Sequence, residues 1–168
     1  MKLKTLIVYY SEHHGNTKKV ARAMAEVLNT KLFKTQDIDL GIISQYGLIG
    51  FGSGIYWGKH HKQLFDIIDR LPNQTSKKTF IFSTSGAANK SMSFHEHLKS
   101  KLSKKGFEII GEFSCLGFDT AISESGINKG RPNDKDLNKA KEFALNLFAD
   151  YTRNDFLKKF LSFTKSDV

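Results

Sequence analysis

The sequence is poor in cysteine and proline, and it lacks long hydrophobic runs. It has one cysteine and two prolines among 168 residues. The single Cys115 excludes an internal disulfide framework and any metal site built from several cysteines. No apolar run approaches the roughly 20 residues that a membrane-spanning helix requires. The N-terminus shows no leader with a small-residue cleavage site, so we expect a protein of the reducing cytoplasm.

Common catalytic and nucleotide-binding signatures are also missing from the sequence. We find no G-x-S-x-G element, no Ser-His-Asp order and no paired-carboxylate signature, so the catalytic residues stay unknown. A triphosphate loop needs G-x-x-x-x-G-K-[ST], but Gly15 is followed by Asn-Thr-Lys-Lys. A dinucleotide loop needs G-x-G-x-x-G after the first strand, where this chain has one glycine.

The chain carries a formal net charge of +9. A strongly basic protein raises the question of a nucleic acid or an anionic membrane as partner. The basic excess is spread over both halves of the sequence, so neither half holds a basic arm or tail. We interpret the charge as a lysine-rich, solvated surface and expect no nucleic-acid partner.

Short apolar runs alternate with segments of helical periodicity along the chain. Five such alternations predict parallel strands joined by right-handed crossovers, with helices on both faces of the sheet. The sequence therefore predicts an α/β fold, a three-layer sandwich around a five-stranded parallel sheet. The predicted strands are Thr5–Tyr10, Lys31–Thr35, Leu48–Ile55, Thr79–Ser83 and Phe107–Leu116, and the predicted helices are Lys18–Leu28, Lys62–Leu71, one after Ser93 and one from about Asn133 to about Tyr151.

In such sheets ligands bind beyond the carboxyl ends of the strands. The first loop there, Ser11–Thr17, leads directly into a predicted helix. The N–H groups of a first helical turn have no partner within the helix, and the helix dipole makes that end partly positive. Gly15 allows close approach of a ligand, and Ser11, Asn16 and Thr17 add short polar groups. The loop could be an ordinary helix start, but its composition favours a cradle for one terminal phosphate.

The next two loops fit a planar ligand. The stretch "GSGIYWGKHH" holds the only tryptophan, Trp57, beside Tyr56 and between glycines. A tryptophan in such a loop is well placed to stack on a flat ring, although it could also fold back onto the first helix. The loop from Thr84 to Met92 is small and polar. A ligand with one phosphate and one planar ring is flavin mononucleotide, FMN.

On these motifs the chain resembles the flavodoxin-like family from Leu6 to about Phe148. The family's first loop ends in Gly-Asn-Thr, as Gly15-Asn16-Thr17 do here, and its Trp-Gly pair resembles Trp57-Gly58. The resemblance implies the sheet order 2-1-3-4-5 and FMN as cofactor. It implies that Trp57 stacks on the ring and that the Gly58 peptide responds to protonation of the ring. The cofactor-binding residues that follow from the loops and the resemblance together are Ser11, His13, His14, Gly15, Asn16, Thr17, Ser53, Gly54, Tyr56, Trp57, Gly58, Ser83, Thr84, Ser85 and Gly86.

The basic residues after the Trp-Gly pair bear on function. Lys59, His60 and His61 stand where the resemblance would place acidic side chains. Positive charge near the ring would stabilise a negatively charged reduced flavin and favour two-electron chemistry, unless these side chains point to solvent. Two functions follow: an FMN-binding electron-transfer protein, and alternatively an FMN-dependent oxidoreductase acting on a quinone or a tetrapyrrole precursor. The partner is then a redox protein or a small-molecule electron acceptor.

The histidines of two loops and the C-terminal segment could form further sites. His13 and His14 could meet His60 and His61, but no carboxylate or cysteine completes a ligand set, so we predict no metal site. We predict a domain over residues 1–151 and an amphipathic helical extension of it over residues 152–168. That basic extension, with Phe156 and Leu157 on its apolar arc, could touch a membrane surface or a second copy, but packing on its own domain is favoured. The oligomeric state stays open.

Overall fold

The computed structural model describes residues 4–87, 92–121 and 123–163. Strands and helices alternate along the chain as the hydrophobic pattern predicts. The strands are β1 (Thr5–Tyr10), β2 (Lys31–Lys34), β3 (Leu48–Tyr56), β4 (Lys59–His60), β5 (Lys77–Ser85) and β6 (Phe107–Leu116). The helices are α1 (Asn16–Leu28), α2 (Lys62–Arg70), α3 (Glu96–Lys104) and α4 (Asp134–Phe163), with short 3₁₀ turns η1 (Leu40–Gln45) and η2 (Ser93–His95).

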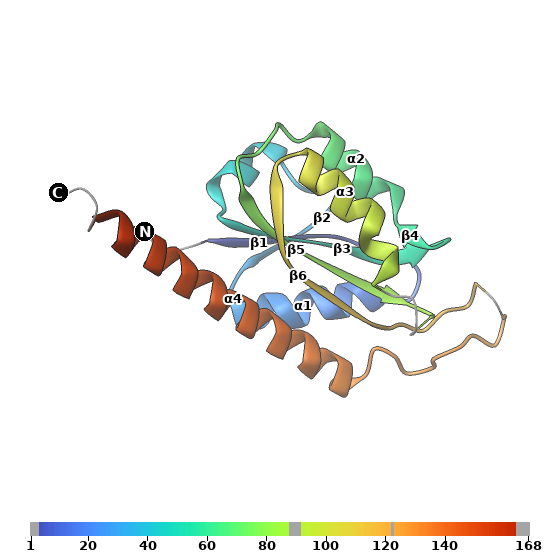
Figure 1. Cartoon of the computed structure of the whole chain (residues 1–168). Coiled ribbons are helices and arrows are strands. Elements are labelled where there is room, and N and C mark those ends of the chain that lie inside the picture. The colour runs from blue at the N-terminus through green and yellow to red at the C-terminus, as the bar shows by residue number, and fades with distance from the viewer. Residues whose placement is uncertain (1–3, 88–91, 122, 164–168) are drawn as a thin grey trace.

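The main sheet has five parallel strands in the order β2-β1-β3-β5-β6. This confirms the predicted three-layer α/β architecture and strand order, because β5 and β6 are the fourth and fifth parallel strands. The two-residue β4 pairs with β3 in antiparallel orientation. Figure 1 shows α1 and α4 on one face of the sheet and α2 and α3 on the other.

Each face of the sheet has its own hydrophobic core. The core under α2 and α3 contains Leu6, Val8, Ile49, Phe51 and Ile81. The core under α1 and α4 contains the alternate residues of the same strands, among them Ile7, Leu48, Phe80 and Phe82. Successive side chains of a strand point to opposite faces, so buried parallel strands need apolar residues at consecutive positions.

The glycines of β3 make room for phenylalanine rings. In the strand register Gly50 lies opposite Phe80 and Gly52 opposite Phe82. A Cβ atom built on either glycine would come within 2.3 Å of the facing ring. The strand runs through its glycines to Tyr56, one residue beyond the predicted Leu48–Ile55, because a neighbouring ring fills the space of each missing side chain.

Helix α4 is longer than predicted. It starts after Asn133, where Arg131 forms a two-pronged ion pair with Asp136, and runs without a break to Phe163 rather than ending near Tyr151. Its last turns project past the sheet in Figure 1. The side chains from residue 158 onward lie outside the described residues. Within the described ranges, no helix is long and apolar enough to cross a membrane.

Candidate functional site

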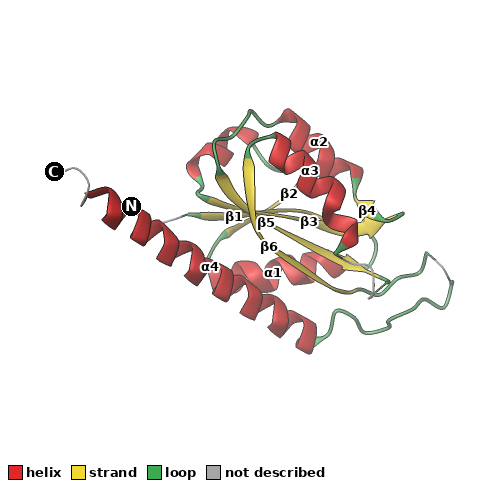
Figure 2. Cartoon of the chain, in the orientation of Figure 1, coloured by secondary structure: helices red, strands yellow, loops and turns green. Residues whose placement is uncertain are grey.

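A cavity of about 470 Å³ opens beyond the carboxyl ends of β1, β3, β5 and β6. This is the edge at which ligands bind in parallel α/β sheets, and the volume lies in the range of small-molecule sites. Figure 2 shows the connecting loops gathered at this end of the molecule. The cavity is lined by Ser11, Glu12, His13, His14, Asn16, Thr17, Gly54, Ile55, Tyr56, Trp57, Thr84, Ser85, Gly86, Gly117, Phe118, Asp119, Thr120 and Ala121.

The start of α1 forms one wall of the cavity. Gly15 is its N-cap in the left-handed conformation (φ 68°), which favours glycine. Within the described chain, Gly15 provides no side-chain cap and the first turn holds no acidic residue. Ser11 Oγ accepts a hydrogen bond from the Lys18 N–H at 3.2 Å. The preceding N–H groups point from a partly positive helix end, which is the arrangement that binds anions.

Hydrogen bonds join the loops that surround the cavity. Thr17 Oγ1 lies 2.8 Å from Thr84 Oγ1, which links α1 to β5 in the buried wall. Asn16 Nδ2 donates to the Phe118 carbonyl at 2.7 Å and so links α1 to the segment after β6. Asn16 Oδ1 is buried and, among the described residues, has no partner. An unpaired buried acceptor in a cavity wall is a place where a ligand donor can bind.

Trp57 and Gly58 form the turn of a tight β-hairpin. Tyr56 pairs with Lys59 across it, and both central residues have positive φ, 52° for Trp57 and 78° for Gly58. Two positive φ values identify a type I′ turn, the geometry that suits a two-residue hairpin. Trp57 is 98% exposed, with its indole at the cavity mouth. A large aromatic side chain held on a strained turn and left uncovered is suited to stacking on a flat ligand.

Aromatic rings support the same side of the cavity. Tyr10 stacks on His61, with ring centroids 3.6 Å apart, and Tyr56 meets His61 edge-on at 5.0 Å. The Tyr10 hydroxyl donates to Glu12 at 2.6 Å. Burial and this bond to Glu12 raise the pKa of Tyr10 to about 12, and the same bond lowers the pKa of Glu12. Tyr10 therefore stays protonated and Glu12 stays charged at neutral pH.

The structure brings together most of the predicted cofactor-binding residues. Those that line the cavity are Ser11, His13, His14, Asn16, Thr17, Gly54, Tyr56, Trp57, Thr84, Ser85 and Gly86. Gly15 and Gly58 set the two turns by their positive φ but are not part of the lining. Ser53 and Ser83 are not part of the lining either. Both are fully buried on the face of the sheet that α2 and α3 cover, where their hydroxyls lie within hydrogen-bond distance of His60 and His95, and their role in cofactor binding stays a prediction.

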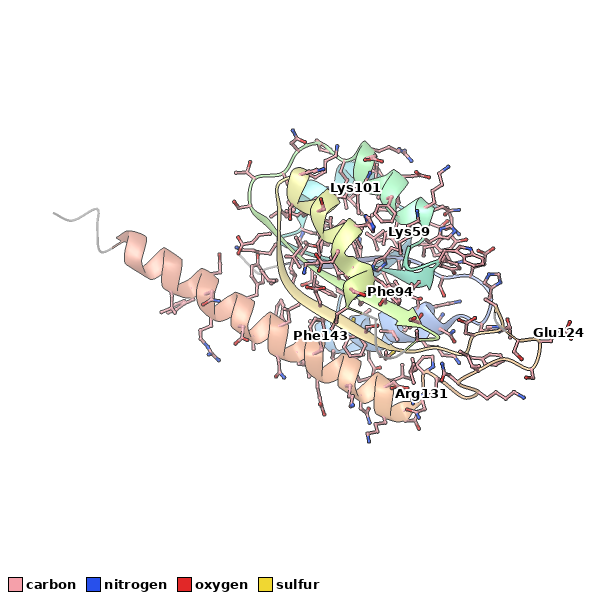
Figure 3. All side chains as sticks on the ribbon, turned by 45° about the vertical axis from the view of Figure 1, so that its right-hand side comes forward. Lys59, Phe94, Lys101, Glu124, Arg131 and Phe143 are labelled. Carbon is pink, nitrogen blue, oxygen red and sulfur yellow. The ribbon has the colours of Figure 1, made fainter. Side chains whose placement is uncertain are left out.

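The lining also contains residues that the sequence did not single out. Glu12, Ile55 and the segment from Gly117 to Ala121 were not among the predicted cofactor-binding residues. This segment follows β6, whose carboxyl end faces the same edge as those of β1, β3 and β5, so its position in the topology was the available signal. Gly117 is needed there, because a Cβ atom would lie 2.7 Å from Asn16 Nδ2. Figure 3 shows Glu124 at the far tip of the loop that continues from this segment.

The three basic residues after the Trp-Gly pair do not form the cluster of positive charge that the sequence predicted. Only Lys59 is exposed. His60 is 2% exposed, and burial holds its pKa well below the ordinary value. His61 stacks on Tyr10, and burial lowers its pKa as well. At neutral pH the turn therefore carries the charge of one lysine rather than of a cluster. Among the described residues, no three His, Cys, Asp or Glu side chains form a group that could hold a metal ion.

Beneath the turn, Ser83, His95 and Glu112 form a buried chain of hydrogen bonds. Ser83 Oγ lies 2.8 Å from His95 Nε2, and His95 Nδ1 lies 3.0 Å from Glu112 Oε2. The arrangement has the spacing of a serine-hydrolase triad. Ser83 and His95 are both 0% exposed, so no substrate can reach the hydroxyl and the chain of bonds is structural.

The fold and the site together define a class of protein. The family model described as "Flavodoxin domain" matches residues 6–117, and the chain belongs to the flavodoxin family. "Uncharacterized protein MJ0298" of Methanocaldococcus jannaschii is 49% identical over 145 residues, which cover 84% of this chain and 96% of that protein.

Solved flavodoxins share the fold at low sequence identity. A flavodoxin from the domain Archaea is 18% identical, with a TM-score of 0.60 over 86% of this chain and 96% of that one. Oxidised Flavodoxin 1 from Bacillus cereus is also 18% identical, with a TM-score of 0.64 over 87% and 98% of the two chains. At this identity the likeness concerns the fold alone.

Proposed function

We propose that the protein binds FMN in this cavity and acts as an electron-transfer flavoprotein. The observation that carries the proposal is the joining of two features in one cavity: the N-terminus of α1, whose N-cap Gly15 has no side chain, and an almost fully exposed tryptophan on a turn. The first suits a phosphate and the second suits a planar ring. The Flavodoxin domain match supports FMN over other ligands of this description.

The described residues fit the parts of FMN. The start of α1 would hold the phosphate through its N–H groups, helped by Ser11, His14, Asn16 and Thr17. The buried, unpaired Asn16 Oδ1 could accept a hydrogen bond from the ligand. Trp57 and Tyr56 would cover the ring, and Thr84, Ser85 and Gly86 would line its edge with the segment after β6. When bound, FMN would supply redox chemistry, and the chain supplies binding, orientation and electrostatics.

The surroundings of the turn favour electron transfer over the alternative oxidoreductase function. The expected positive cluster is reduced to Lys59, because His60 and His61 are held neutral by burial. An exposed lysine acts weakly through water, so the electrostatic argument for two-electron reduction of a quinone or tetrapyrrole precursor loses most of its force. An exposed indole at the cavity mouth also offers a surface on which a redox partner protein could dock.

A cytoplasmic location and the domain limits 1–151 and 152–168 stay predictions.

Stepwise anaerobic reduction of the FMN-loaded protein, followed by visible absorption, tests this function. We expect two resolved one-electron steps, as suits a carrier of single electrons. One unresolved two-electron step, together with turnover of a quinone, would favour the oxidoreductase instead. A protein that is colourless as purified and takes up no FMN would refute both functions.

A further inference from the structure

The hairpin that carries Trp57 needs support from outside itself. Its second strand, β4, is two residues long, and within the described residues β3 is its one partner strand. A two-stranded hairpin is marginal in water without further packing. Where the turn lies therefore depends on what holds β4. Of its two residues, Lys59 is exposed and His60 is buried, so His60 is the attachment.

The side chain of His60 is bonded to the sheet on one side only. His60 Nδ1 lies 2.9 Å from Ser53 Oγ, and the same oxygen accepts from the His61 N–H at 3.0 Å. Both bonds attach the carboxyl end of β4 to Ser53 of β3. On the other side of the ring, His60 Nε2 is buried and has no hydrogen-bond partner among the described residues.

A second buried imidazole lies against His60. The rings of His60 and His95 have centroids 5.0 Å apart. His95 is bonded to Ser83 and to Glu112, and Glu112 is also paired with Lys99 at 2.9 Å. Burial lowers the pKa of His95, and the bond between its Nδ1 and Glu112 acts in the opposite direction by favouring a protonated ring. His60 has no carboxylate among its described hydrogen-bond partners, so it is the ring of the pair that cannot accommodate a charge.

The charged groups of the neighbouring elements do not stabilise a charge on the His60 ring. Among the charged side chains of α3, Glu96 and Lys99 pair with each other at 3.1 Å. From β6 the group is Glu112, which His95 and Lys99 occupy. From its own segment the neighbours are exposed Lys59 and stacked His61. The ring of Phe94 in η2 lies close to the turn, because a Cβ atom built on Gly58 would be 3.7 Å from that ring. Lys59 and Phe94 are labelled in Figure 3.

We propose that His60 is a positioning residue for Trp57 and acts as an acid-sensitive latch: its neutral ring holds the hairpin against β3, and uptake of a proton by that ring releases it. The latch rests on the proposed function only in assigning Trp57 to the ligand. The release itself is a property of the chain.

The direction of the pH effect follows from the two states of the hairpin. In the open hairpin His60 is solvated, and a solvated imidazole has a pKa near 6.5. In the closed hairpin, burial and the neighbouring His95 lower the pKa of His60. The open state therefore binds more protons as the pH falls below about 6.5. Its population relative to the closed state rises by about tenfold for each further pH unit, until the closed-state pKa is reached.

Amide hydrogen exchange of the full chain without FMN tests the latch directly. The readout is the protection factor of the His61 N–H and of the β3–β4 pair, corrected for the intrinsic pH dependence of exchange. Between pH 6.5 and 5 we expect this protection to fall by about 15-fold in total while β1 and β5 in the sheet centre keep theirs. His60→Asn, whose amide can still reach Ser53, should remove the pH dependence. His97→Gln, which removes an exposed histidine of α3, should leave it unchanged.

Ser53→Ala supplies a second, independent variant. It removes the acceptor of both bonds, so it should lower hairpin protection about tenfold or more at neutral pH. Equal pH profiles for wild type and His60→Asn would overturn the latch, as would loss of hairpin protection only together with the sheet centre. FMN titration at pH 7 and pH 5 then separates the two proposals. If the latch operates but FMN never binds, the proposed function fails and the latch stands.

Discussion

Replacing Trp57 by alanine should separate ligand affinity from protein stability. Trp57 is 98% exposed, so its side chain makes almost no packing contribution to the folded chain. Its φ of 52° is equally unfavourable for alanine, so the turn does not gain or lose by the change. We therefore expect the free energy of unfolding of Trp57→Ala to lie within about 0.5 kcal/mol of wild type.

The effect on FMN binding should be much larger. A tryptophan buries roughly 150–250 Å² when fully covered, and stacking on one face covers about 100 Å² of apolar surface. At about 25 cal/mol per Å², this burial contributes about 2.5 kcal/mol, or roughly a 60-fold difference in affinity. Flavin fluorescence titration gives the affinity, and urea unfolding followed by circular dichroism gives the stability.

A matched control comes from the other end of the molecule. Phe156→Ala removes an aromatic side chain that is 68% exposed on α4, outside the cavity. It should leave FMN affinity unchanged. The reasoning is refuted if Trp57→Ala loses less than about threefold in affinity, or if it loses affinity and stability together.

Three further changes test the fold around the site. Gly50→Ala should lower the free energy of unfolding by about 1–3 kcal/mol, measured by urea titration, because the new methyl group would meet the Phe80 ring at 2.3 Å. Native Cys115 should react with iodoacetamide at pH 8 at least about a hundredfold more slowly than in urea, by mass spectrometry, because burial raises its thiol pKa to about 12. Arg131→Met should lower the free energy of unfolding by about 1–3 kcal/mol, and with it the thermal midpoint, because the nearly buried Asp136 carboxylate loses its ion pair.

The sequence was most informative where periodicity and topology decide the structure. Alternation of apolar runs and helical segments predicted the parallel sheet and the edge at which the cavity opens, and the resemblance to the flavodoxin-like family implied the strand order. Local backbone signals were also readable: Gly15 and the Trp57-Gly58 pair mark the two turns that shape the cavity. These features depend on residues close together in the chain or on rules that hold for all parallel α/β sheets.

What the sequence did not reveal depends on contacts between distant segments. The role of the β3 glycines is not visible until the strand register shows Phe80 and Phe82 opposite them. Ser53 and Ser83 look like ligand groups until the strand phase places them on the far face of the sheet. His60 looks like surface charge until its ring is found buried beside His95. In each case the side chain's role is set by its partner in a neighbouring strand or helix.

The central claim is that the start of α1 binds a phosphate while Trp57 covers the attached ring. Parallel titrations of the full chain with FMN and with riboflavin, followed by the fluorescence of Trp57 and of the flavin, test both parts at once. We predict quenching of both signals with either ligand and at least about tenfold tighter binding of FMN, because only FMN brings the charged group that the helix N-terminus stabilises. Equal affinities for the two ligands, or no change in either signal at micromolar concentrations, would contradict it.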